Sequence, residues 1–367
     1  MIEFSEMIRQ VMAAKASDLH LAVGAPPVMR CSGELRPIGP DRLTPQDTRE
    51  LLYGILSQDQ RRRLETELEL DFSYHMPGLA RFRVNAYHQR GVLGAALRVV
   101  PTEIRSLSEL NMPPTVGEWA TLPRGLVLVT GATGSGKSTT LAGLIDLIND
   151  TRSVHIMTIE DPIEFLHKHK RSLVNQRELG GDTISFANAL RSALRQDPDV
   201  ILLGEMRDLE TIQIALTAAE TGHLVLGTLH TADAPQTIDR VIDVFPSEQQ
   251  DQVRVMLANS LQGVLCQQLL PALEGGRVAA CEVMIATPAV RNLIREGKTH
   301  QIYSMLQTGA QYGMQAMNTA LADLVRTGRI RRDLALERSS SPTELQRLLE
   351  SDAFPELING RVARAVV

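Results

Sequence analysis

The stretch Gly131-Ala-Thr-Gly-Ser-Gly-Lys137-Ser138 fits the phosphate-binding template G-x-x-x-x-G-K-[ST] at every fixed position. The apolar run Gly125–Thr130 before it predicts a buried parallel strand, and the helical spacing of leucine and isoleucine in residues 138–150 predicts a helix after it. The glycines let successive backbone N–H groups point at phosphate oxygens, and the helix N-terminus adds partial positive charge. The stretch therefore predicts a nucleoside triphosphate site.

Within this loop the charged and hydroxyl side chains have separate predicted roles. Lys137 would reach the β- and γ-phosphates, and Ser138 would bind Mg²⁺ through its hydroxyl. The other predicted phosphate contacts come from the loop and the first turn of the helix, at Gly131, Thr133, Gly134, Ser135, Gly136 and Thr139.

Composition and charge limit the classes of protein. The chain has 367 residues, of which 43% are hydrophobic and 22% charged, as expected for a globular protein of two or three domains. A net charge of −5 weighs against a general nucleic-acid binder. No apolar run approaches the roughly 18 residues that span a bilayer, and no signal-peptide pattern is present, so any membrane association is expected to be peripheral or through a partner. Cys31, Cys266 and Cys281 form no C-x-x-C pair and predict buried thiols.

The predicted fold class is α/β, with two domains joined by a proline-marked linker. Residues 1–100 predict a small mixed domain with an antiparallel sheet, and residues 101–123, with four prolines, predict a linker with a short helix. In residues 124–338 strands alternate with helices, which predicts a parallel sheet covered on both faces. After Ser247 this domain is predicted to be mainly helical, with one more strand at 277–285. Residues 339–367 predict a poorly ordered tail with one helix.

Two acidic motifs follow predicted strands. The stretch Asp199–Glu205 is a buried strand that ends in an acid, and Glu205 is a candidate for holding Mg²⁺, although Asp is the usual residue there. An ordinary strand with an exposed glutamate is the alternative. The stretch Thr158–Glu164 has three carboxylates within five residues, one of which could position the attacking water. A solvated acidic turn is equally compatible with this composition.

Histidines and arginines supply further candidates. In the stretch Gly222–Thr231 an apolar strand separates His223 from His230, and His230 at the carboxyl end could sense the γ-phosphate; a structural histidine is the alternative. Arg81 and Arg83 share one face of a strand by the period of two. They are either a solvated cationic face or arginines supplied to a phosphate that another subunit binds.

These motifs, in this order, resemble the secretion-ATPase superfamily and, within it, the PilT-type retraction ATPases of type IV pili. The resemblance extends from Ala16 to about Ile330. Its most specific matches are the phosphate loop, the acidic box, the histidine box, the segment Arg195–Asp208, and the helix Ala289–Glu296, which looks like the signature of the retraction subgroup. The zinc-binding cysteine cluster of pilus assembly ATPases is absent from this sequence.

The resemblance implies a PAS-like N-terminal domain followed by a RecA-like P-loop domain with a helical C-terminal part. It implies a cytoplasmic homo-hexamer at the inner membrane that hydrolyses ATP with Mg²⁺ to power pilus retraction and twitching motility. The implied partners are an inner-membrane platform protein and a paralogous pilus ATPase, with no nucleic acid. An accessory retraction paralogue, a pilus-assembly or type II secretion ATPase, and a nucleotide-gated scaffold remain as alternatives.

The resemblance also implies roles for particular residues. Glu164 corresponds to the catalytic glutamate of the acidic box, Glu205 to the acid of the second box, and His230 to a member of the histidine box. The implied metal ligands are Ser138 and Glu205. Arginine fingers are implied at Arg83 and Arg98, which match the family without a gap. Around residue 90 this sequence departs from the family pattern by one residue, and such a shift turns a side chain to the other face of a strand.

Overall fold

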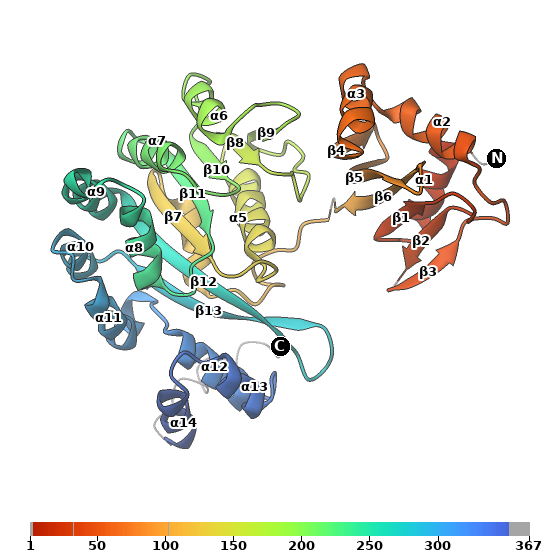
Figure 1. The fold of residues 1–367 in the computed structure, drawn as a ribbon. Coiled ribbons are helices and arrows are strands. Elements are labelled where there is room, and N and C mark those ends of the chain that lie inside the picture. Colours follow the sequence, from red (N-terminus) through yellow and green to blue (C-terminus); the bar gives the residue numbers. More distant parts are fainter. Residues whose placement is uncertain (1–2, 32, 102, 352–367) are drawn as a thin grey trace. The chain divides into compact units, whose positions relative to one another are not determined.

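The computed structural model describes residues 3–31, 33–101 and 103–351, which form two compact units (Figure 1). One unit comprises residues 3–104 together with residues 160–168 and 176–185. The other comprises residues 105–159, 169–175 and 186–351. No helix in the described ranges is long and apolar enough to cross a membrane.

The first unit is built on a six-stranded antiparallel sheet. Its strand order is β3-β2-β1-β6-β5-β4, with β1 (Asp18–Leu21), β2 (Val28–Cys31), β3 (Glu34–Pro37), β4 (Glu69–Met76), β5 (Ala80–Gln89) and β6 (Val92–Val100). Its three helices are α1 (Phe4–Ala13), α2 (Pro45–Ile55) and α3 (Gln58–Glu67). Capping boxes fix the starts of α2, where Thr44 and Asp47 exchange hydrogen bonds, and of α3, where Ser57 and Gln60 do the same.

Alternation along β5 separates the core of this unit from a polar face. Phe82, Val84 and Ala86 are fully buried and belong to one cluster with the apolar residues of the three helices. Successive side chains of a strand point to opposite faces, so Arg81 and Arg83 lie on the other face of the sheet. The sheet thus confirms that these two arginines share a face.

The second unit contains a seven-stranded sheet with the order β13-β12-β7-β11-β10-β8-β9. Its strands are β7 (Gly125–Thr130), β8 (His155–Glu160), β9 (Leu173–Glu178), β10 (Val200–Leu203), β11 (Leu224–Leu229), β12 (Leu261–Pro271) and β13 (Arg277–Ile285). From β12 through β7, β11 and β10 to β8, neighbouring strands are parallel, whereas β13 is antiparallel to β12. The prediction of a parallel sheet is therefore confirmed.

Helices cover both faces of this sheet, and alternate residues of β7 serve the two layers (Figure 1). Val127 and Val129 pack with α5 (Lys137–Thr151), while Leu126 and Leu128 belong to the cluster formed with the helices of the opposite face. Those are α6 (Phe186–Ala193), α7 (Leu209–Glu220), α8 (Ala234–Asp243) and α9 (Ser247–Ser260). Each fully buried aliphatic side chain contributes about 1.5–3 kcal/mol to folding.

Short helices complete this unit. Before β7 lie α4 (Pro114–Glu118) and the 3₁₀ turn η1 (Trp119–Thr121), where a short helix was expected. After β13 follow α10 (Pro288–Arg295), η2 (Thr299–Gln301), α11 (Ile302–Thr308), η3 (Ala310–Tyr312), α12 (Met317–Arg326), α13 (Arg332–Arg338) and α14 (Pro342–Glu350).

Three features differ from the expectations. Strand β9 was not predicted, and the region after Ser247 contains β12 in addition to the expected strand at Arg277–Ile285. The helix expected in the tail is α14, and it is docked, since Leu345 is fully buried and the Glu344 carboxylate accepts hydrogen bonds from Tyr303 and Asn318. Residues 352–367, the rest of the expected tail, lie outside the described residues.

Candidate nucleotide-binding site

The loop after β7 has a backbone that requires its glycines. Gly131, Gly134 and Gly136 have φ angles of 137°, 80° and 95°, which L side chains rarely adopt. At Gly131 a Cβ would also lie 2.3 Å from the carbonyl oxygen of Gln267 in β12. The contact with Gln267 was not predicted, because strand β12 was not expected from the sequence. The loop is thus held against β12 and turns directly into α5.

The polar groups of this loop fit a triphosphate. The Lys137 Nζ donates hydrogen bonds to the carbonyl oxygens of Gly131 (2.8 Å) and Ala132 (3.1 Å), so the ammonium lies over the loop. The Ser135 hydroxyl is buried and has no hydrogen-bond partner among the described residues, which points to a polar ligand there. The backbone N–H groups of the first turn of α5 have no partner within the helix. With the hydroxyls of Ser138 and Thr139, these groups suit phosphate and Mg²⁺.

Neighbouring parallel strands bring two further candidates to the edge where the loop begins. Because β7, β11 and β10 are adjacent and parallel, their carboxyl ends meet at one edge. His230 directly follows β11, and Glu205 lies two residues beyond β10. The His230 Nε2 is 2.9 Å from the Glu205 Oε1. The structure therefore brings these two predicted residues together.

Electrostatics keep Glu205 ionised. Burial alone would raise its pKa, but the hydrogen bond from Arg207 and the charge of His230 outweigh burial, so the pKa of Glu205 lies below its usual value. Its side chain is only 20% exposed, whereas those of Arg207 and His230 are 76% and 45% exposed. A carboxylate held in this way suits a divalent cation.

The three acids of the acidic box differ in their surroundings. Glu160 ends β8, is half-buried and accepts a hydrogen bond from the Gln176 side chain at 3.1 Å. Asp161 and Glu164 are exposed, in the part of the chain that belongs to the first unit. An exposed carboxylate can reach a substrate, so Glu164 remains the candidate for positioning water.

The candidate arginine fingers are cross-strand partners in the first unit. Arg83 of β5 is directly opposite Arg98 of β6, so the two side chains share a face. Arg83 is exposed, and the Arg98 side chain is 72% exposed, with its Nε 2.9 Å from an oxygen of Asp18. Arg90 has a φ of 52° and lies beside Gly91 in the turn between these strands, away from the pair. Two adjacent guanidinium groups attract an anion.

Two further residues from the motifs do not lie at the phosphate loop. His223 precedes β11, at the strand end opposite His230, and its ring Nδ1 is 3.0 Å from the carbonyl oxygen of Ala218. Arg291 of α10 donates hydrogen bonds to the carbonyl oxygens of Ala286 (2.8 Å) and Asn259 (2.9 Å), and so ties α10 to the end of α9.

The chain is similar to known proteins over nearly all its length. A family model described as type II/IV secretion system protein matches residues 80–275. The type IV pilus retraction ATPase PilT of Pseudomonas aeruginosa is 53% identical over 341 residues, which cover 93% of this chain and 99% of that protein. The type IV pilus ATPase PilU of the same organism is 40% identical, over 96% of this chain and 94% of PilU.

A solved structure agrees with these matches. The crystal structure of the pilus retraction motor PilT with bound ADP superposes with a TM-score of 0.88 and 51% identity. The alignment covers 95% of this chain and all of that chain. The mixed α/β fold with two sheets is therefore shared with a nucleotide-binding motor.

Proposed function

This chain belongs to the type II/IV secretion system protein family, and we propose that within it the chain is the ATPase motor that powers type IV pilus retraction. The observation that carries the ATPase activity is the loop Gly131–Ser138, with the Lys137 ammonium over the loop and the Glu205–His230 pair after neighbouring strands. Retraction is favoured over other roles because the identity is 53% to PilT and 40% to PilU.

The residues have distinct proposed roles in hydrolysis. Backbone N–H groups of the loop and Lys137 bind the β- and γ-phosphates, which neutralises charge that develops on the γ-phosphate. Ser138 and Glu205 hold Mg²⁺, which supplies further charge neutralisation on the phosphate oxygens. Glu164 positions the attacking water, and His230 donates to Glu205 and so transmits changes at the γ-phosphate.

The arginine pair couples the site to assembly. We propose a homo-hexamer in which Arg83 and Arg98 of one subunit reach the triphosphate bound by the next, so that hydrolysis releases these contacts. The proposed partners are an inner-membrane platform protein and a paralogous pilus ATPase, at the cytoplasmic face of the membrane. The proposed domains are PAS-like (1–100), a linker (101–123), RecA-like (124–338) and a tail (339–367).

The test is steady-state phosphate release by the purified chain. Lys137→Ala removes the ammonium that contacts phosphate and is expected to abolish turnover, whereas circular dichroism should show an unchanged fold. Omission of Mg²⁺ should have the same effect on the unaltered protein. Turnover retained by Lys137→Ala would contradict the site, and nucleotide binding without turnover in the unaltered protein would favour the scaffold alternative.

A further inference from the structure

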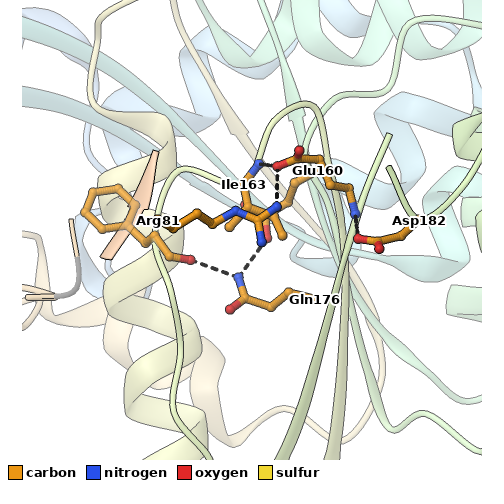
Figure 2. A network of polar contacts seen from close by, with 7 residues as sticks. Arg81, Glu160, Ile163, Gln176 and Asp182 are labelled. Atoms are coloured by element: carbon orange, nitrogen blue, oxygen red, sulfur yellow. Dashed lines mark hydrogen bonds and ion pairs between the residues drawn. The ribbon is translucent and has the colours of Figure 1, made fainter. Parts of the chain in front are cut away.

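A buried carboxylate at the end of β9 connects the acidic box to the N-terminal sheet. The Glu178 Oε2 accepts hydrogen bonds from the backbone N–H of Ile163 (2.9 Å) and from the Arg81 Nη2 (3.0 Å). Its own backbone N–H donates to the Asp182 carboxylate at 2.8 Å, which fixes the turn after the strand. In Figure 2 Arg81, Ile163 and Asp182 converge on this cluster from three separate segments.

A second side chain of β9, that of Gln176, also binds the segment around Glu164. Gln176 lies two residues before Glu178 and so shares its face of the strand. Its Nε2 donates to the Glu160 carboxylate (3.1 Å), and both residues are labelled in Figure 2. The same Nε2 donates to the Phe165 carbonyl (2.8 Å), and the Gln176 Oε1 accepts from the His167 N–H (2.8 Å). Hydrogen bonds therefore fix the segment on both sides of Glu164, at Glu160 and Ile163 before it and at Phe165 and His167 after it.

The charge of Arg81 is needed because Glu178 is buried. The Glu178 side chain is 7% exposed and the Arg81 side chain 17% exposed. A carboxylate at this depth is unfavourable without a nearby cation, and loss of one partner of a buried pair leaves an uncompensated charge. Without Arg81, Glu178 would move toward solvent and take its hydrogen bond away from Ile163, the residue directly before Glu164.

We propose that Arg81 and Glu178 are positioning residues, which hold the acidic turn so that Glu164 is correctly placed for hydrolysis in the same subunit. Arg81 thus differs from Arg83, two residues along the same face of β5, which is exposed and proposed to act on the next subunit. This inference rests on the proposed function, because it takes Glu164 as a group that acts in hydrolysis.

The first test reads the position of the loop without reference to activity. Hydrogen–deuterium exchange is measured on the full-length chain, in a peptide that spans residues 160–168. Arg81→Ala and Glu178→Ala are expected to speed exchange in this peptide. The control is the pair Arg63 and Glu67 on α3, which has the same residue types but side chains 52% exposed, and whose alanine variants should change nothing there. Unchanged exchange in both Arg81→Ala and Glu178→Ala would overturn the proposal.

The second test is kinetic. Each alanine variant should lower kcat for ATP about 10- to 100-fold, because small misplacement of a catalytic group has effects of this size, with little change in KM. The double variant should be no slower than the slower single one, because the pair acts as a unit. Glu178→Gln and Arg81→Lys, which retain hydrogen bonding and remain usable where an alanine variant fails to fold, should recover part of kcat. A Glu178→Ala variant with normal kcat would overturn the proposal.

The third test separates action within one subunit from action across subunits. Lys137→Ala is co-expressed with a second variant, either Arg83→Ala or Arg81→Ala, and mixed rings are purified. With Arg83→Ala as the second variant, a site can turn over only where an intact phosphate loop meets an intact Arg83 of the neighbouring subunit. Random mixing of equal amounts gives this combination at about a quarter of the sites. With Arg81→Ala the mixed rings should show no turnover above the residual activity of Arg81→Ala itself, because every intact loop then belongs to a subunit with a displaced acidic turn. Recovery with Arg81→Ala would overturn the proposal. No recovery with Arg83→Ala would instead contradict the proposed action across subunits, and the exchange result would still decide the role of Arg81.

Discussion

At the scale of single residues, the half-buried Glu205 is the acid proposed to hold Mg²⁺. It is held by Arg207 and by His230, and both lower its pKa against the opposing effect of burial. A group with a lowered pKa stabilises the fold at neutral pH and loses that contribution only as the pH falls through its folded pKa. Glu205 therefore carries a negative charge at neutral pH, as the proposed role in binding Mg²⁺ requires.

Glu205→Gln tests this role, because it keeps the volume of the side chain and an acceptor for His230 but removes the charge. The Mg²⁺ concentration for half-maximal ATP turnover is expected to rise about 10- to 100-fold. The matched control is Glu210→Gln on α7, an exposed glutamate paired with Arg191, which should leave the Mg²⁺ dependence unchanged. An unaltered Mg²⁺ dependence in Glu205→Gln would exclude it as a metal ligand.

The residues of the phosphate loop could be predicted because the motif is contiguous and its glycines are required by backbone angles alone. The sequence places Glu205 and His230 each after an apolar run, so their positions at strand ends could be predicted. Their pairing could not, because it depends on β10 and β11 being neighbours in the sheet. The contact between Arg81 and Glu178 could not be predicted, because it joins positions 97 residues apart. The partners of Arg291 were likewise hidden, because they are backbone carbonyl groups.

At the scale of elements, Glu282 of β13 joins two helices. The residue is 1% exposed, and its carboxylate accepts from the backbone N–H groups of Ala234 (2.8 Å) and Met317 (3.3 Å). These are the first residues of α8 and α12, so one side chain caps both helix N-termini. Because α8 begins four residues after His230, Glu282 connects the histidine box to the C-terminal helices.

Burial raises the pKa of Glu282 to about 7. This pKa is above that of an exposed glutamate, so the folded chain binds more protons at Glu282 than the unfolded chain does. Protonation of Glu282 therefore stabilises the fold at low pH, and this stabilisation is lost as the pH rises from about 4.5 through 7. The free energy of unfolding, relative to Glu282→Gln, should therefore fall by about 2–3 kcal/mol between about pH 5 and pH 8. Urea unfolding at fixed protein concentration measures it.

The exposed Glu220 of α7 provides the control for this measurement. Glu220→Gln should follow the unaltered protein at each pH, because neither form of this side chain is buried. The stability of the unaltered protein relative to Glu282→Gln could instead stay constant with pH or change in the opposite direction. The Glu282 carboxylate would then be ionised in the folded state near neutral pH, because the two N–H donors lower its pKa more than burial raises it.

Elements were predictable where the sequence marks their limits. Helices α2 and α3 start at capping boxes, and the apolar run Gly125–Thr130 has the same bounds as β7. Strand β12 was missed because it begins at Leu261, directly after the last residue of α9, without a glycine or proline to mark the change. Strand β9 was missed because its polar sequence, LVNQRE, lacks an apolar alternation.

At the scale of the whole molecule, the phosphate loop and the Arg83–Arg98 pair belong to different compact units. The loop supplies the groups that bind phosphate, whereas the paired guanidinium groups have exposed side chains on their sheet. In a ring where Arg83 and Arg98 of one subunit contact the triphosphate bound by the next, both the phosphate loop and the arginine pair would be used. Light scattering with and without ATP is the direct measurement, and a stable monomer under both conditions would contradict the ring.

The direction of pilus movement separates retraction from the alternatives. In a piliated bacterium that carries this gene, deletion is expected to leave excess surface pili and to abolish twitching, because pili are still assembled but no longer withdrawn. The unaltered gene should restore both properties, and Lys137→Ala should restore neither, since retraction needs turnover. Pili sheared from the cells and quantified by their subunit give the measurement. Absent pili would identify an assembly ATPase instead, and a normal pilus number with weakened twitching would identify an accessory motor that acts beside a second retraction ATPase.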